Sequence, residues 1–148
     1  IMKELGQTGA AGESKDGMDI SLARINLQTK ELQWAGANNA MYIISKGTLK
    51  EIKADKQPIG YYPISKPFTN HIFQLEKDES IYLFTDGYAD QFGGSKGKKF
   101  MYKRFEEKLS ANATLPMEEQ KDVLNKIFDG WKGQYDQVDD VCVIGIKV

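Results

Sequence analysis

Several segments between residues 18 and 75 alternate apolar and polar residues, with the period of two that is typical of half-buried β-strands. Gly, Pro, Asn and Asp interrupt the alternation, and Ser45-Lys46-Gly47-Thr48 has the composition of a tight hairpin turn. Residues 80–85 and 141–148 are nearly continuous apolar runs, which predicts two strands buried on both faces. The pattern therefore predicts strands over residues 18–27, 31–35, 41–44, 49–52, 69–75, 80–85 and 141–148.

Between the last two predicted strands the spacing of apolar residues becomes helical. Residues 102–111 carry Phe105 and Leu109 four positions apart, which predicts a short helix. Residues 116–131 predict a clearer one, because Pro116 suits a first turn and Gly133 lies where the helix should end. Its apolar side chains form one stripe at spacings of three and four: Val123, Leu124, Ile127, Phe128 and Trp131.

The order of the predicted elements is strands, then two helices, then one strand. This order differs from the alternation of parallel βαβ units, so we expect an α+β fold with a mostly antiparallel sheet and helices on its face. The length favours a single domain over residues 1–148. Within it, residues 1–15 are expected to be a loop or the frayed end of a helix.

Composition narrows the classes of function. Lys and Arg total 20 and Asp and Glu total 21, a net charge of −1 that disfavours a protein wrapping nucleic acid. No apolar run approaches the roughly 18 residues of a membrane-spanning helix, so no membrane insertion is expected. One Cys and one His exclude an intrachain disulfide and two-histidine metal motifs. Carboxylates therefore remain as the chemistry of a candidate enzyme.

Two acidic motifs stand at the ends of the two most apolar strands. Asp86 follows the first of them, with Gly87 allowing a sharp turn and Asp90 close behind, and Asp139 and Asp140 directly precede the second. If the two strands are neighbours in a sheet, Asp86 and Asp139 can converge on one spot. Clustered carboxylates suit Mg²⁺ or Mn²⁺, and a pair of such ions can promote hydrolysis of a phosphate ester.

Both motifs also have a purely structural interpretation. Thr-Asp-Gly at the end of a strand is often only a turn, and Asp-Asp before a strand is often a solvated hairpin end. Spacing alone favours this structural interpretation over the metal site.

The order of five segments reverses that preference, because it resembles the catalytic domain of the metal-dependent protein phosphatases. This is the type 2C or PPM family, in the bacterial branch of the sporulation stage II protein E phosphatase and of phosphatases that regulate anti-anti-sigma factors. No single segment is decisive, but together and in this order they are specific and span nearly the whole chain. The segments are residues 16–23, 34–42, 57–60 (Gln-Pro-Ile-Gly), 84–90 (Phe-Thr-Asp-Gly-Tyr-Ala-Asp) and 139–141 (Asp-Asp-Val).

The resemblance implies an α-β-β-α sandwich of mostly antiparallel sheets flanked by helices, with a binuclear Mn²⁺ or Mg²⁺ site. By position, it implies that Asp86 and Asp139 are the catalytic metal ligands and that Gly87 and Asp140 border the same metal site. Asp90 is a weaker candidate, because the second acid of its motif can instead support the turn. In this family, metal-bound water attacks phosphorus in line, without a covalent phosphoenzyme.

One family segment has no match in this chain. The Asp-x-x-Gly-His-Gly segment, which supplies a bridging carboxylate, should lie before Ile1, and the chain does not begin with Met. We therefore expect a C-terminal portion of the domain, with its N-terminal part missing and the remaining metal ligands upstream of residue 1. Such a piece could be inactive even if its parent protein is an active enzyme.

The resemblance also implies a function and its partners. These are a cytoplasmic serine/threonine phosphatase of bacterial signal transduction, a phosphorylated anti-anti-sigma-like regulatory protein as substrate, and an upstream sensor or receiver domain in the parent chain. The alternative is a non-catalytic pseudophosphatase or regulator-binding module of the same fold, which the unmatched carboxylate segment favours. An unrelated β-rich ligand-binding domain is a third hypothesis.

Four other features each have a purely structural and a functional interpretation, and the structural one is favoured. The Gly- and Lys-rich residues 93–99 are expected to be a solvated loop rather than a basic flap over a substrate. His71 is expected to be a surface or cross-strand residue rather than a proton donor. Cys142 is expected to be an inert core thiol, and Asn38 a turn former.

Overall fold

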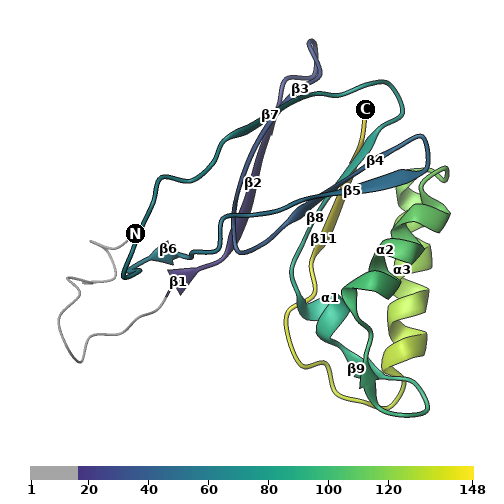
Figure 1. The fold of residues 1–148 in the computed structure, drawn as a ribbon. Helices are drawn as coiled ribbons and strands as arrows, with labels where there is room; N and C mark the ends of the chain where they lie inside the picture. The colour runs from purple at the N-terminus through teal and green to yellow at the C-terminus, as the bar shows by residue number, and fades with distance from the viewer. Residues whose placement is uncertain (1–16) are drawn as a thin grey trace. The chain divides into compact units, whose positions relative to one another are not determined.

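The structure, a computed structural model, describes residues 17–148 (Figure 1). The expectation for residues 1–15 lies outside the described residues. The chain divides into two compact units, each treated separately below. One contains the described residues up to Met41 together with Ile52–Leu75, and the other contains Tyr42–Glu51 and Glu76–Val148. The single domain expected over residues 1–148 stays a prediction.

The first unit is built on a three-stranded antiparallel sheet with the order β2-β3-β7. Its central strand buries alternate side chains, Leu32 and Trp34 among them, and the indole N–H of Trp34 donates to Ser21 Oγ at 2.8 Å. The strand predicted over residues 18–27 is interrupted at Asp19 and gives two strands, the first of which pairs with β6. The elements are β1 (Gly17–Met18), β2 (Ile20–Ile25), β3 (Glu31–Ala37), β6 (Ile59–Gly60) and β7 (His71–Gln74).

The second sheet has four strands in the order β11-β8-β4-β5. The hairpin predicted at residues 45–48 is confirmed. Lys46 and Gly47 have φ angles of 49° and 78°, the left-handed backbone that a two-residue turn between twisted strands requires. The strands are β4 (Met41–Ser45), β5 (Thr48–Ile52), β8 (Ser80–Phe84) and β11 (Val143–Lys147).

The two predicted helices of the second unit are confirmed to within one or two residues at each end. They are α2 (Tyr102–Asn112) and α3 (Met117–Lys132), and Pro116 stands at the N-cap of α3. Buried tyrosines tie the sheet to these helices: Tyr42 donates to Glu106 Oε1 at 3.0 Å and Tyr82 to Gln120 Oε1 at 2.6 Å. Three short elements precede α2: α1 (Gly87–Asp90), β9 (Phe92–Gly93) and β10 (Lys98–Lys99).

The prediction that both nearly continuous apolar strands are buried on two faces is confirmed for β8 and wrong for β11. In β8, Ser80, Ile81, Tyr82 and Phe84 are all buried. In β11, Ile144 is 49% exposed, because among residues 17–148 this strand stands at the end of the sheet order and pairs only with β8. The apolar pattern is the same in both strands, and it does not reveal which strand stands at an edge.

These elements form an α+β fold with antiparallel strand pairs, as the order of elements predicted. Within residues 17–148, no helix combines the length and the apolar character needed to cross a membrane.

Candidate functional site

The pairing of β8 with β11 brings the two acidic motifs to adjacent segments of backbone. The strands are antiparallel with Phe84 opposite Val143, so the end of β8 lies beside the start of β11. Just past that point the Thr85 N–H donates to the Cys142 carbonyl oxygen at 3.0 Å. The condition set in the sequence analysis, that these two strands are neighbours, is met, and Asp86 and Asp139 each lie one residue beyond residues that are in direct contact.

The side chain of Thr85 reinforces this junction. Its Oγ1 donates to the carbonyl oxygen of Asp140 at 2.7 Å and accepts the N–H of Cys142 at 3.0 Å. One hydroxyl therefore bridges two backbone groups of the loop that carries the acidic doublet. Sequence reasoning placed Thr85 only at the end of a strand, because the bridge depends on which strand lies beside it.

Gly87 is needed at this junction because of space rather than backbone conformation. A sharp turn at Gly87 was expected, but α1 begins there, after an N-cap Asp86 with φ −70°, and the φ angle of Gly87 is not positive. A Cβ at Gly87 would instead collide with the backbone carbonyl of Asp140, with its carbon only 2.9 Å away. Gly87 therefore lets the first turn of α1 approach the acidic doublet closely.

The three carboxylates of the candidate site are exposed to solvent. Asp86 stands at the N-cap of α1, and Asp139 accepts the N–H of Asp140 at 2.7 Å through Oδ1. Because they are hydrated, burial imposes no electrostatic cost that a metal would have to offset. They are also open to an ion that approaches from solvent.

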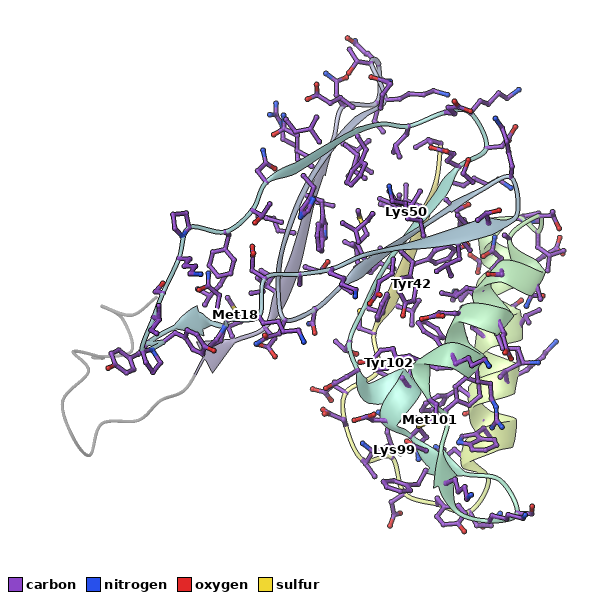
Figure 2. The ribbon with its side chains drawn as sticks, in the orientation of Figure 1. Met18, Tyr42, Lys50, Lys99, Met101 and Tyr102 are labelled. Atoms are coloured by element: carbon purple, nitrogen blue, oxygen red, sulfur yellow. The ribbon has the colours of Figure 1, made fainter. Side chains whose placement is uncertain are left out.

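Asp90 has a structural partner. Its Oδ2 forms an ion pair of 2.8 Å with Nζ of Lys99, which is labelled in Figure 2. Because Lys99 belongs to β10, the ion pair ties α1 to the β9–β10 hairpin. Nearby, burial raises the pKa of Tyr102, and the negative charges of Asp86 and then Asp90 raise it further. Tyr102 thus lies within the negative field of both acids, while the ion pair favours a supporting role for Asp90.

A second buried side chain holds the chain that leads to the acidic doublet. Gln91 is fully buried, and its Nε2 donates to the carbonyl oxygens of Asp136 at 2.8 Å and of Phe92 at 3.0 Å. The residue follows α1 directly, so it links the segment after Asp90 to the approach of Asp139. Nothing in the sequence pattern distinguished this glutamine from a surface residue.

The donors present match a hard cation in chemical type but not in number. Carboxylate oxygens are the ligands that Mg²⁺ and Mn²⁺ prefer. Among residues 17–148, however, no three His, Cys, Asp or Glu side chains are grouped closely enough to hold a metal ion. The described residues therefore contribute at most part of a metal site.

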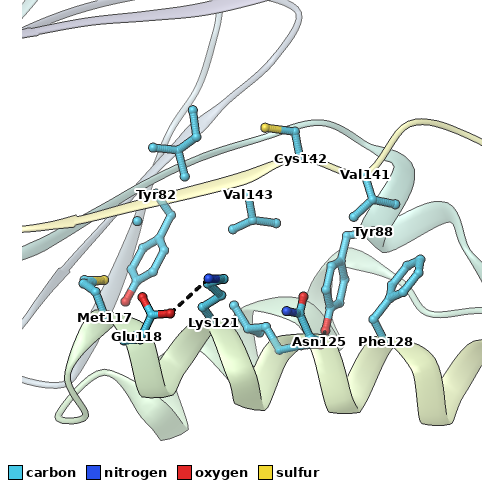
Figure 3. Close-up of a pocket in the computed structure, with 13 residues that line it drawn as sticks. Tyr82, Tyr88, Met117, Glu118, Lys121, Asn125, Phe128, Val141, Cys142 and Val143 are labelled. Carbon is cyan, nitrogen blue, oxygen red and sulfur yellow. Dashed lines mark hydrogen bonds and ion pairs between the residues drawn. The ribbon is translucent and has the colours of Figure 1, made fainter.

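The groove between α3 and β11 is a separate feature of the second unit (Figure 3). It has a volume of about 570 Å³ and is lined largely by apolar side chains, including Met117, Leu124 and Val143. The one carboxylate in its lining, Glu118, is paired with Lys121 at 3.0 Å. The acidic motifs therefore do not open into this groove.

The other residues singled out in the sequence lie apart from this junction in their contacts. His71 pairs across the sheet with Trp34, with the rings 5.3 Å apart, which confirms a cross-strand role. Asn38 has a φ of 58° and forms a turn, donating through Nδ2 to Asp19 at 2.7 Å. Cys142 is exposed, so the expectation of a core thiol is wrong, because β11 is an edge strand. Within residues 93–99, residues 94–97 form the turn between β9 and β10, and Lys96, Lys98 and Lys99 are exposed, as expected of a solvated loop.

Comparisons with known proteins place the chain in a family and show which solved structures share its fold. The family model of Stage II sporulation protein E (SpoIIE) matches residues 2–148, whereas no curated protein matches. Among solved structures, the SiaA-PP2C domain of Pseudomonas aeruginosa is 28% identical, with a TM-score of 0.80 over 88% of this chain and 51% of that one. The family match overturns the hypothesis of an unrelated β-rich ligand-binding domain.

Two more distant structures share the fold. The SpoIIE phosphatase domain of Bacillus subtilis is 14% identical, with a TM-score of 0.65 over 87% of this chain and 57% of that one. The Mycobacterium tuberculosis serine/threonine phosphatase PstP/Ppp is also 14% identical, with a TM-score of 0.56 over 87% and 59%. The chain thus spans little more than half the length of the structures it matches. It belongs to the SpoIIE family and has the fold of part of a PP2C-type phosphatase domain.

Proposed function

We propose that this chain forms part of the active site of a metal-dependent serine/threonine phosphatase. Its reaction would be hydrolysis of phosphoserine or phosphothreonine on a regulatory protein in bacterial signal transduction. The observation that carries the proposal is the pairing of β8 with β11, which sets the Asp86 motif beside the Asp139 motif in a chain of the SpoIIE family.

The proposed roles follow from the junction. Asp86 and Asp139 would hold a divalent cation, with Gly87 and Asp140 bordering the site and further ligands coming from outside the described residues. Mn²⁺ or Mg²⁺ bound there would supply Lewis-acid chemistry, polarising a phosphoryl oxygen and lowering the pKa of water. The Thr85 hydroxyl orients the loop that carries Asp139 through its bonds to Asp140 and Cys142.

The partners and location are part of the same proposal. The substrate would be a small phosphorylated regulator of the anti-anti-sigma type, and a sensor or receiver domain elsewhere in the protein would control the phosphatase. Such a system operates in the cytoplasm. These statements are supported by family membership alone.

The test is a Mn²⁺-dependent phosphatase assay on the full-length protein with a phosphoserine peptide. Asp86→Asn and Asp139→Asn should each lower kcat at least about 100-fold and weaken Mn²⁺ binding in calorimetry, because each removes an anionic ligand. Asp122→Asn is the matched control, since Asp122 is an exposed carboxylate of α3 outside the acidic motifs. Near-normal hydrolysis by both site variants would overturn the assignment.

A second candidate function is a pseudophosphatase that binds a phosphorylated regulator without hydrolysing it. It is favoured by the lack of a group of three potential metal ligands among residues 17–148. The same assay separates the two functions. Binding of the phosphoserine peptide with no Mn²⁺-stimulated release of phosphate would favour the pseudophosphatase.

A further inference from the structure

A cavity of about 720 Å³ lies where the β9–β10 hairpin meets the start of α2 and the end of α3, all within the second unit. We call it the basic cavity, because five cationic side chains line it: Lys96, Lys98, Lys99, Lys103 and Arg104. Among residues 17–148, Glu107 is the only carboxylate that lines it. The local excess of positive charge contrasts with a net charge of −1 for the chain as a whole.

Most of this charge has no carboxylate partner within the described part of the chain. Lys99 is paired with Asp90 at 2.8 Å, but none of the other four cations forms an ion pair with a residue between 17 and 148. All four are exposed. The basic cavity is therefore an uncompensated positive surface that a negatively charged ligand would neutralise.

Arg104 is held in place without any carboxylate. Its guanidinium centre lies 4.3 Å from the ring centroid of Trp131 and 5.6 Å from that of Phe100, so it is positioned by cation–π contacts. Trp131 is itself fixed, because its indole N–H donates to the carbonyl oxygen of Gln91 at 3.0 Å. An arginine held on aromatic faces keeps its N–H donors available for an incoming anion.

The start of α2 carries a charge pattern that its own stability does not explain. Lys103 and Arg104 occupy its first turn, and no acid is present there. The N-terminus of a helix is positive, so each such cation costs about 0.3–1 kcal/mol at an exposed site. Residues that locally weaken the fold tend to concentrate at binding sites, where a bound ligand offsets their cost in stability. An anion bound beside this turn would be such a ligand.

We propose that the basic cavity binds an acidic segment of a protein partner. In the context of the proposed phosphatase function, on which this identification rests, that partner is the phosphoprotein substrate. The volume and the spread of the cations over a hairpin and a helix suit several carboxylates along an extended chain rather than a single small anion. The ion pair between Lys99 and Asp90 ties this surface to α1, which begins directly after Asp86. A segment docked here therefore binds next to the element that directly follows the proposed metal ligand Asp86.

The test measures binding separately from catalysis, in the full-length protein. The probe is a fluorescein-labelled peptide rich in Asp and Glu, followed by anisotropy at about 50 and 200 mM salt, because exposed charge attraction weakens with ionic strength. Lys96→Glu with Lys98→Glu should weaken binding at least about tenfold, because it reverses two of the attractive charges. The control pair, Lys53→Glu with Lys126→Glu, makes the same net change at exposed lysines outside the cavity and should bind the peptide as the wild type does.

Three further measurements decide the interpretation. The variants must keep the wild-type circular dichroism spectrum, and Lys96→Gln with Lys98→Gln, which only neutralises the charge, should give an intermediate loss. An oligonucleotide of equal charge that binds as tightly as the peptide would overturn the proposal, as would equal binding by the cavity and control pairs. Hydrolysis of a small aryl phosphate should be unchanged in the cavity variant. If that hydrolysis is absent in all forms while peptide binding still depends on Lys96 and Lys98, the phosphatase function fails and the acidic docking site stands.

Discussion

Thr85 Oγ1 donates a hydrogen bond of 2.7 Å to the carbonyl oxygen of Asp140, 55 residues away in sequence. The same oxygen accepts the N–H of Cys142 at 3.0 Å. This single side chain therefore fixes the loop that carries Asp139 and Asp140 to the end of β8, where the Asp86 motif begins. The two motifs are separated by two helices in sequence, and their proximity depends on this contact together with the pairing of β8 and β11.

Thr85→Val keeps the shape of the side chain but removes both hydrogen bonds. We expect it to lower the free energy of unfolding by about 1–3 kcal/mol, because the N–H of Cys142 loses its acceptor. It should also weaken Mn²⁺ binding in the full-length protein. Thr85→Ser keeps the hydroxyl and is the control. Urea unfolding and metal titration of both variants measure the effect, and equal behaviour of Val and Ser would rule out this role.

Gly87→Ala and Gly130→Ala make the same chemical change in two environments. At Gly87 the new Cβ meets the backbone of Asp140, so we expect a loss of about 1–3 kcal/mol from overpacking. At Gly130, inside α3, no atom of the described chain beyond the neighbouring residues and the helix's own backbone lies within 4 Å of the new Cβ, and the higher helix propensity of Ala should stabilise the fold by about 0.5–1 kcal/mol. Thermal unfolding of the two variants should move in opposite directions. A neutral Gly87→Ala would contradict the close approach of α1 to the acidic doublet.

Stability should fall steeply above about pH 10, the ordinary pKa of tyrosine. Burial raises the pKa of Tyr42 in the folded state, and the charge of Glu106 raises it further. Above pH 10 the unfolded chain loses the Tyr42 proton while the folded chain keeps it, so rising pH favours unfolding. Each such group contributes up to about 1.4 kcal/mol per pH unit, and this stability is fully present below pH 10. Tyr42→Phe should make the loss of unfolding free energy with rising pH shallower. Denaturant titrations from about one pH unit below to about one unit above the ordinary tyrosine pKa measure it. An unchanged dependence on pH would count against this role of Tyr42.

Cys142 should react with an aromatic disulfide reagent in the folded 148-residue chain, without denaturant. The residue is exposed, and it directly precedes β11, the strand at the end of the sheet order among the described residues. A buried thiol reacts only as fast as the protein opens, whereas an exposed one reacts at a rate limited by its thiolate fraction. Cys142→Ser provides the blank. A reaction seen only in urea would show that this thiol is covered after all.

Local elements were predictable where one short-range signal dominates. The turn at Lys46 and Gly47 and the boundaries of α3 follow from turn chemistry, apolar spacing and capping residues, and the structure agrees with each. The four-residue α1 was missed, because Gly87, Tyr88 and their neighbours are too few to show a helical period. The β9–β10 hairpin was missed for a similar reason, since its strands have only two residues each.

Properties that depend on neighbours were harder to predict. That β8 and β11 pair was foreseen only as a condition, yet it is what brings Asp86 and Asp139 onto adjacent backbone. The exposure of Cys142 and Ile144 could not be read from an apolar run, because an edge strand and a central strand have similar residues. Gly87 was singled out correctly but for the wrong reason. Its Cβ is excluded by the backbone of Asp140, and the local sequence does not show this contact.

The pairing of β8 with β11 also has a kinetic consequence. The contact between Thr85 and Cys142 spans a sequence separation of 57 residues that includes α1, α2 and α3, so closing this loop has an entropic cost. Contacts of such long sequence separation form late in folding, after α2 and α3 can pack and shorten the effective loop. We therefore expect the two acidic motifs to meet only in the last stages of folding, so that affinity for a metal ion would report the completion of this half of the chain.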